Sequence, residues 1–235
     1  MNKNIELMLR LQDFFDKALN AQKTIDTCEN NIDSLQKKLE EAQKKYSLSQ
    51  AKLKQLEKEL KEKELSLAEN DEKLGKLEKK RELVKTEREQ QAISSEIELA
   101  KKAGSSYEDD VLSLMDTINE EQTLLEKMKK ELEEQGEKTK QSIVTLEKEI
   151  EKNEKIEAQN KDNYSALLPE LDGNYRQRFD KLINSKKSKI VGEVHGEVCG
   201  VCNFQIPTQL AKEASRNENV VSCTNCGAFI YKQQD

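Results

Sequence analysis

The chain has 235 residues, of which 37% are charged and 4% aromatic, with no tryptophan and a formal net charge of −6. So few large apolar side chains exclude one extensive globular core, and the abundance of Glu, Lys, Leu, Gln and Ala is typical of long helices and coiled coils. No apolar run approaches the roughly 18 residues of a membrane span, and the N-terminus lacks the apolar stretch of a secretory signal, so we expect a cytoplasmic protein with no membrane partner.

The first long segment, residues 1–168, is expected to be helical because both prolines of the chain lie beyond it. Apolar residues recur at alternating steps of four and three from Leu7 to Val84, which is the spacing of a coiled-coil seam. Between residues 32 and 84 this frame has sixteen core positions, and four of them are polar: Ser49, Lys63, Asn70 and Arg81. Cys28 falls on the same seam and is interpreted as a small buried apolar side chain rather than a reactive thiol.

A second apolar stripe, from Ile93 to Ile150, gives the seam a partner within the same chain. Thr86 and Glu89 form a Thr-x-x-Glu capping box, which can start a new helix. We therefore predict an antiparallel coiled-coil hairpin over residues 1–168, with its turn near residues 84–87 and two arms of about 80 residues each.

Two alternatives to this hairpin remain open from the sequence. Gly104 could end a helix, and Ser105 with Glu108 forms another capping box, which would move the turn to residues 103–108 and leave arms of unequal length. A parallel homodimer could pair the first stripe with its own copy, although the matched second stripe disfavours this arrangement.

Residues 169–189 are predicted to form a short helix and a basic neck, because Pro169 suits the first turn of a new helix and would break an existing one. The neck carries the dense basic cluster of the chain: Arg176, Arg178, Lys181, Lys186, Lys187 and Lys189. This cluster fits either a solvated helix face or a site for phosphate or an acidic partner. The acidic excess of the chain lies in residues 1–169, so any nucleic-acid contact should be confined to the C-terminal part.

Two Cys-x-x-Cys pairs, twenty residues apart, stand near the end of the chain: Cys199, Cys202, Cys223 and Cys226. Each pair can wrap one turn of backbone around a metal, and together they supply the four thiolates of a tetrahedral zinc site. Two disulfides are the alternative, but these need an oxidising compartment, which nothing in the sequence indicates. Because four thiolates leave no position for water or substrate, we expect one structural Zn²⁺ without catalytic chemistry.

Residues 190–235 are predicted to form a small β-rich zinc ribbon that depends on the metal for most of its stability. Asn203 and Gly227 each follow the second cysteine of a pair, where the backbone often needs positive φ. Five residues are assigned to the small core of the ribbon rather than to a base-stacking surface: Phe204, Ile206, Leu210, Phe229 and Tyr231. The one histidine, His195, lacks a nucleophile or carboxylate motif and is interpreted as a turn or surface residue.

Several segments resemble the bacterial C4-type zinc-ribbon proteins carried on a coiled-coil hairpin: Tyr175–Phe179, Cys199–Cys202, Val221–Gly227, Val84–Glu89 and Tyr107–Met115. The resemblance covers nearly the whole chain, but Thr224 and Ala228 stand where the family commonly has proline and arginine. It implies a non-enzymatic adaptor. In some flagellated or type III-secreting bacteria, similar proteins bind an alternative sigma factor and have been linked to messenger RNA and to secretion components.

Taken together, the sequence predicts a mainly α protein that acts by interaction. It contains no P-loop, dinucleotide-binding fingerprint, nucleophile motif or open metal site, so we expect no enzyme and no small-molecule substrate. We expect an adaptor or chaperone-like protein, whose coiled-coil stalk carries a structural-zinc head that docks a protein partner; the resemblance implies a sigma factor or a secretion or flagellar component. The alternative is a nucleic-acid binding protein that uses the basic neck and the zinc ribbon, for example in transcription regulation.

Overall fold

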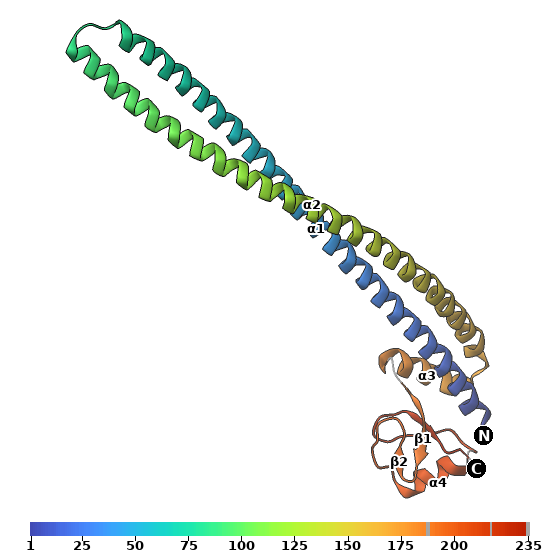
Figure 1. Ribbon diagram of the computed structural model, residues 1–235. Helices are drawn as coiled ribbons and strands as arrows, with labels where there is room; N and C mark the ends of the chain where they lie inside the picture. Colours follow the sequence, from blue (N-terminus) through green and yellow to red (C-terminus); the bar gives the residue numbers. More distant parts are fainter. Residues whose placement is uncertain (187–188, 217, 234–235) are drawn as a thin grey trace. The chain divides into compact units, whose positions relative to one another are not determined.

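The computed structural model describes the chain except residues 187–188, 217 and 234–235, and the side chain of Lys186 also lies outside the described part. Two α-helices of 81 residues each, α1 (Lys3–Leu83) and α2 (Glu87–Leu167), form an antiparallel hairpin (Figure 1). A 3₁₀ turn, η1 (Leu168–Glu170), leads into α3 (Gly173–Lys186). The predicted class, mainly α with a coiled-coil hairpin and a small β-rich C-terminal part, is confirmed.

The chain reverses between Leu83 and Glu87. The side chains of the predicted capping box contact each other there: the Glu89 backbone N–H donates to Thr86 Oγ1 at 3.4 Å, and the Thr86 hydroxyl donates to the Glu89 carboxylate at 2.5 Å. Residues 103–108, the alternative position for the turn, lie inside α2, with Gly104 buried on the seam.

The structure divides into two compact units, Ser34–Ser142 and a second unit made of Met1–Asp33 with Ile143–Asp235. In Ser34–Ser142, which contains the reversal, four buried apolar residues near the turn form a core: Leu77, Ile93, Ile97 and Ala100. Each of these four belongs to one of the two predicted seams.

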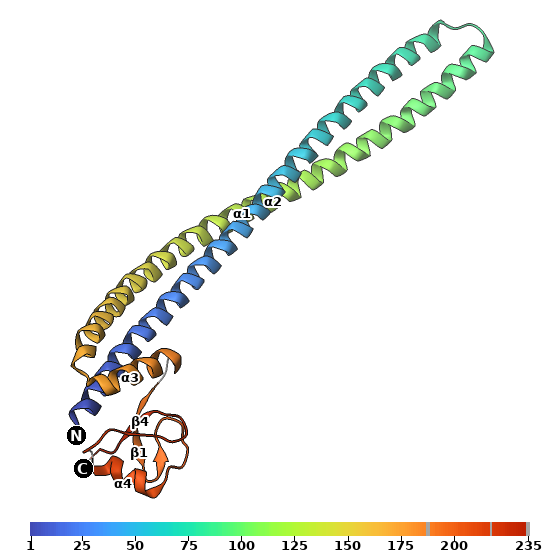
Figure 2. The ribbon, with the colours of Figure 1, turned by 180° about the vertical axis from the view of Figure 1, so that it is seen from behind.

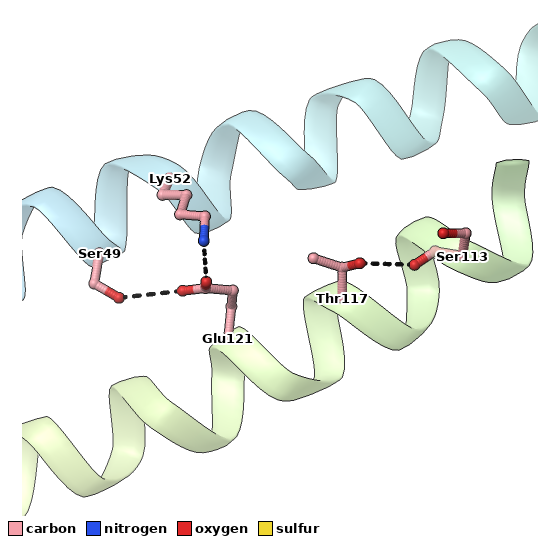
Figure 3. A network of polar contacts seen from close by, with 5 residues as sticks. All are labelled: Ser49, Lys52, Ser113, Thr117 and Glu121. Carbon is pink, nitrogen blue, oxygen red and sulfur yellow. Dashed lines mark hydrogen bonds and ion pairs between the residues drawn. The ribbon is translucent and has the colours of Figure 1, made fainter.

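Three of the four polar residues of the α1 seam in this unit have partners on α2: Ser49, Lys63 and Asn70. Figure 3 shows Ser49 and Lys52 of α1 converging on the carboxylate of Glu121 in α2. Figure 3 also shows the Thr117 hydroxyl of α2, which donates to the backbone carbonyl of Ser113 in the same helix at 2.8 Å. One carboxylate therefore receives two side chains from the opposite helix.

Two further polar seam residues are paired in the same way. Lys63 Nζ lies 2.7 Å from Asp110 Oδ2, and Asn70 Nδ2 donates to the Ala100 carbonyl at 3.0 Å. The fourth polar seam residue, Arg81, is exposed. Because a shift of the two helices would separate these donors from their acceptors, the polar pairs specify which residues of the two arms lie opposite each other.

The second unit has a core that joins the hairpin base, the neck and the C-terminal segment. We define the hairpin base as those parts of α1 and α2 that belong to this unit. Residues from five parts of the chain share one buried cluster: Ile5, Met8 and Leu11 from α1, Leu167 from α2, Leu171 after η1, Phe179 and Ile183 from α3, and Ile190, Val191 and Phe229 from the C-terminal segment. The C-terminal segment therefore packs on helices rather than forming a separate globule.

The C-terminal segment contains a four-stranded sheet in the order β2-β1-β4-β3, with α4 (Thr208–Arg216) between β2 and β3 in the chain. The strands are β1 (Val191–His195), β2 (Val198–Cys199), β3 (Val221–Ser222) and β4 (Phe229–Tyr231). β1 is antiparallel to β2 and parallel to β4, while β3 is antiparallel to β4. Figure 2 shows β1 and β4 side by side below α3.

A second small core lies under this sheet and includes Ile206 with the buried Cys199 and Cys223. The assignment of Phe204 to the small core is wrong, because its side chain is 50% exposed. Within the described residues, no helix is both long enough and apolar enough to cross a membrane.

Candidate metal centre and basic neck

The sheet and its connecting turns bring all four predicted cysteines together. Their Sγ atoms lie within 4.8 Å of one another. Cys199 Sγ is 4.0 Å from Cys226 Sγ, and Cys202 Sγ is 3.8 Å from Cys223 Sγ. A tetrahedral Zn²⁺ with four thiolates at about 2.3 Å requires sulfurs about 3.8 Å apart, so the cluster has the dimensions of a zinc site. Among the described residues these four cysteines form no disulfide, so the disulfide alternative is not observed.

The two cysteine pairs have the same backbone structure. In the first, the Asn203 N–H donates to the Cys199 carbonyl at 2.9 Å and the Cys199 N–H donates to the Phe204 carbonyl at 2.9 Å. In the second, the Gly227 N–H and the Cys223 N–H repeat these bonds to Cys223 and Ala228. Asn203 and Gly227 have φ of 55° and 73°, the positive values predicted for them.

Small residues are needed where the first pair approaches β1. A Cβ added to Gly200 would lie 2.0 Å from the carbonyl oxygen of Glu193, and one added to Gly192 would lie 2.5 Å from the Val201 side chain. Both contacts are far inside van der Waals distance. The first pair can therefore lie against β1 only because neither position carries a side chain.

The thiols differ in how readily they ionise. Burial raises the pKa of the Cys226 thiol to about 12, and neighbouring thiols add to this effect. Burial also raises the pKa of the Cys202 thiol, but hydrogen bonds from the backbone N–H of Phe204 and the amide of Asn225 lower it by more. The net result is a pKa of about 6. One thiolate is therefore stabilised by the protein, and additional negative charge needs a cation to balance it, which a divalent metal supplies.

The comparisons with known proteins agree with this geometry. The sequence profile of the C4-type zinc ribbon domain matches residues 198–230, which include the four cysteines. Residues 198–230 are a C4-type zinc ribbon. The cluster in this zinc ribbon fits one structural zinc held by Cys199, Cys202, Cys223 and Cys226.

Solved structures share the fold of the whole chain, hairpin and zinc ribbon together. CT398 from Chlamydia trachomatis is 20% identical, with 98% of each chain covered and a TM-score of 0.88. The HP0958 protein from Helicobacter pylori is 16% identical, with 100% of this chain and 99% of that chain covered and a TM-score of 0.61. A protein from Mycobacterium smegmatis is 17% identical, with 99% and 100% covered and a TM-score of 0.62. Among curated proteins, none matches the sequence significantly.

Four cations of the predicted basic cluster are described and exposed: Arg176, Arg178, Lys181 and Lys189. Arg178 on α3 turns to the zinc ribbon: its Nη2 donates to the Gly227 carbonyl at 3.0 Å, and its guanidinium lies 5.2 Å from the centre of the Phe229 ring. Burial and the neighbouring Asp13 raise the pKa of the Asp16 carboxyl in α1. The charge of the nearby Lys189 lowers this pKa by a smaller amount.

The remaining cations of the cluster lie on or after α3. Arg176 and Lys181 are exposed on that helix. Lys186 is the last residue of α3, and its side chain and the whole of Lys187 lie outside the described part of the chain. His195 ends β1 and is exposed, in agreement with its interpretation as a surface residue.

Sequence reasoning missed Gln12, which holds the zinc ribbon to α1. Its side chain is only 7% exposed, and its Oε1 accepts hydrogen bonds from the backbone N–H groups of Ile190 at 2.7 Å and Val191 at 2.8 Å. A polar residue beside the apolar stripe of a helix looks like an ordinary surface position. Only its hydrogen bond to a strand about 180 residues later in the chain shows its role.

Proposed function

We propose that this zinc-ribbon protein is a non-catalytic adaptor that binds a protein partner. The observation that carries the proposal is the cluster of four cysteines, because a metal with four thiolates has no open position for a substrate. The metal then stabilises a surface and takes no part in a reaction. The hairpin contributes two long helices whose outer faces are charged, which suits a scaffold.

The surface next to the metal favours a protein as the partner. Phe204 follows the first cysteine pair and is 50% exposed, and Val198, which pairs with Gln205 beside it, is 38% exposed. Exposed aromatic side chains with apolar neighbours are frequent centres of protein interfaces. The family resemblance suggests that the partner belongs to the transcription or secretion machinery.

Affinity capture with the tagged, zinc-loaded full chain tests this proposal. We expect a defined protein to be captured from a lysate of the source cells, with or without nuclease. Phe204→Ala should lose this capture. The matched control Leu48→Ala, which truncates an exposed apolar side chain of the hairpin, should retain it. Capture that disappears with nuclease, or that survives Phe204→Ala unchanged, would contradict the proposal.

A second candidate is nucleic-acid binding by the neck, which the exposed cations Arg176 and Lys181 favour. Arg178 already donates to the Gly227 carbonyl, so we expect few phosphate contacts and weak binding that decreases with salt. RNA binding is compared by fluorescence anisotropy for Arg176→Glu/Lys181→Glu and the control Lys129→Glu/Lys130→Glu. Submicromolar binding at physiological salt that only the neck variant loses would place nucleic-acid binding first.

A further inference from the structure

A pocket with a volume of about 440 Å³ opens at the hairpin base. Its apolar wall consists of Phe14, Phe15, Ala18 and Leu19 from α1 and Tyr164 from α2. The Phe15 and Tyr164 rings lie 6.3 Å apart between centres and are tilted by 54°. Sites for small molecules in proteins have volumes of about 300 to 1,000 Å³ and walls that are mostly apolar and aromatic, so this pocket has the size and lining of such a site.

Three amide side chains line the polar part of the pocket, and all three have the same orientation. Asn160 Nδ2 donates to the Ile156 carbonyl at 2.7 Å, Gln22 Nε2 to the Asp26 carboxylate at 2.8 Å, and Asn184 Nδ2 to the Asp180 carbonyl at 2.9 Å. Each acceptor is an oxygen, so only the amide nitrogen can face it.

This orientation leaves the amide oxygens available to a ligand. In the described part of the chain, the side-chain oxygens of Gln22, Asn160 and Asn184 take part in no hydrogen bond. Asn160 is only 8% exposed, so its oxygen is held at the pocket by a buried side chain. The free polar groups of these three residues are therefore acceptors, and they suit a ligand that donates hydrogen bonds.

Charge around the pocket favours a cation. The Glu157 side chain is 14% exposed, and its Oε1 lies 2.5 Å from Lys161 Nζ, whose own side chain is 66% exposed. The carboxylates of Asp26 and Asp180 accept hydrogen bonds from the lining amides of Gln22 and Asn184. Glu157 and Lys161 are the charged residues among those that line the pocket, and the carboxylate is the less exposed of the two, while Asp26 and Asp180 lie behind two of the lining amides.

We propose that this pocket binds a small organic cation with an apolar body and a protonated amine. The aromatic wall can contact the apolar body and the positive charge, the amide oxygens accept its N–H groups, and the Glu157 carboxylate complements it electrostatically. An organic anion of the same size would meet acceptors and negative charge. This ligand is distinct from the protein partner proposed above, since it occupies a pocket of the hairpin base and not the surface beside the metal.

Three probes of nearly equal size and different charge test the proposal: phenethylammonium, phenethyl alcohol and hydrocinnamate. Their binding to the zinc-loaded full chain is measured by saturation-transfer NMR and by calorimetry. We expect phenethylammonium to bind about tenfold or more tightly than hydrocinnamate, with the neutral alcohol between them. Added salt should weaken binding of the cation more than binding of the alcohol, because only the former depends on charge.

Two variants locate the site. Leu19→Trp should fill the pocket and abolish binding of all three probes, whereas the matched control Ala92→Trp, at an exposed position of α2, should not. Glu157→Gln keeps the shape of the side chain and removes one charge. It should weaken the binding of phenethylammonium about three- to tenfold and leave the binding of phenethyl alcohol unchanged. Helical circular dichroism verifies that each variant is folded, and Glu157→Gln alone suffices if Leu19→Trp does not fold.

Three results would overturn the proposal. The first is the absence of phenethylammonium binding at millimolar concentration. The second is equal affinity for the cation and the anion, which would make the pocket merely apolar. The third is binding that neither Leu19→Trp nor Glu157→Gln changes, which would place the ligand elsewhere on the protein.

Discussion

The side chain of Gln12 pairs with the backbone of Val191 as a neighbouring strand would. Its Oε1 accepts from the Val191 N–H at 2.8 Å, and its Nε2 donates to the Val191 carbonyl at 3.5 Å. Among the described residues, β2 pairs with Val194 and His195 of β1, and no described strand lies beside the first residues of β1 on that side. Gln12 of α1 takes this place and satisfies buried backbone groups that would otherwise be unpaired.

Replacing Gln12 should therefore destabilise the protein. Gln12→Leu leaves the buried N–H groups of Ile190 and Val191 without an acceptor, and each such group costs about 1 to 3 kcal/mol. We expect the free energy of unfolding in urea, followed at the zinc-ribbon end, to fall by an amount of that order. Gln43→Leu, at an exposed position of α1, should change it little. An equal effect of the two substitutions would show that the Gln12 contacts contribute nothing to stability.

The zinc ribbon should hold one zinc per chain and lose it with its ligands. Metal analysis of Cys199→Ser/Cys223→Ser should find no bound zinc, because two of the four thiolates are missing. The helical circular dichroism signal should largely persist, since α1 and α2 have a seam of their own in Ser34–Ser142. A folded zinc ribbon without metal would contradict the structural role of the ion.

Arg178 should stabilise the metal site, and Arg176 should not. Arg178 holds the Gly227 carbonyl at 3.0 Å and covers Phe229, while Arg176 is exposed on the same helix. Loss of this hydrogen bond and cation–π contact should cost about 1 kcal/mol, which corresponds to roughly fivefold faster zinc transfer to a chromophoric chelator in Arg178→Ala. Arg176→Ala serves as the control. If both variants release zinc at the wild-type rate, Arg178 is a surface cation like its neighbour.

The pair Lys63 and Asp110 should fix the alignment of the two arms. Lys63→Glu places two carboxylates opposite each other and should lower the free energy of unfolding, and adding Asp110→Lys should restore most of the loss. Both side chains are more than two-fifths exposed, so the coupling energy should be no more than about 1 kcal/mol. The measurement is a double-mutant cycle by thermal unfolding. Additive effects of the two substitutions would show that the pair is not coupled.

The hairpin and the metal ligands could be predicted from the amino-acid sequence, because both depend on local spacing. A seam that repeats every seven residues specifies the buried face of a helix without reference to distant parts of the chain. Likewise, a Cys-x-x-Cys turn brings two thiols together within one turn of backbone, as the matching hydrogen bonds of the two pairs show. The positive φ of Asn203 and Gly227 followed from the same local pattern.

The contacts that join the zinc ribbon to the helices could not be predicted from the sequence. Gln12 contacts a strand far along the chain, Arg178 of α3 donates to the Gly227 carbonyl, and Phe204 is exposed although it is aromatic. The pocket at the hairpin base likewise combines residues of α1, α2 and α3. These features depend on contacts between individual side chains of segments that are distant in sequence, and the periodicity of each segment does not show which of these side chains meet.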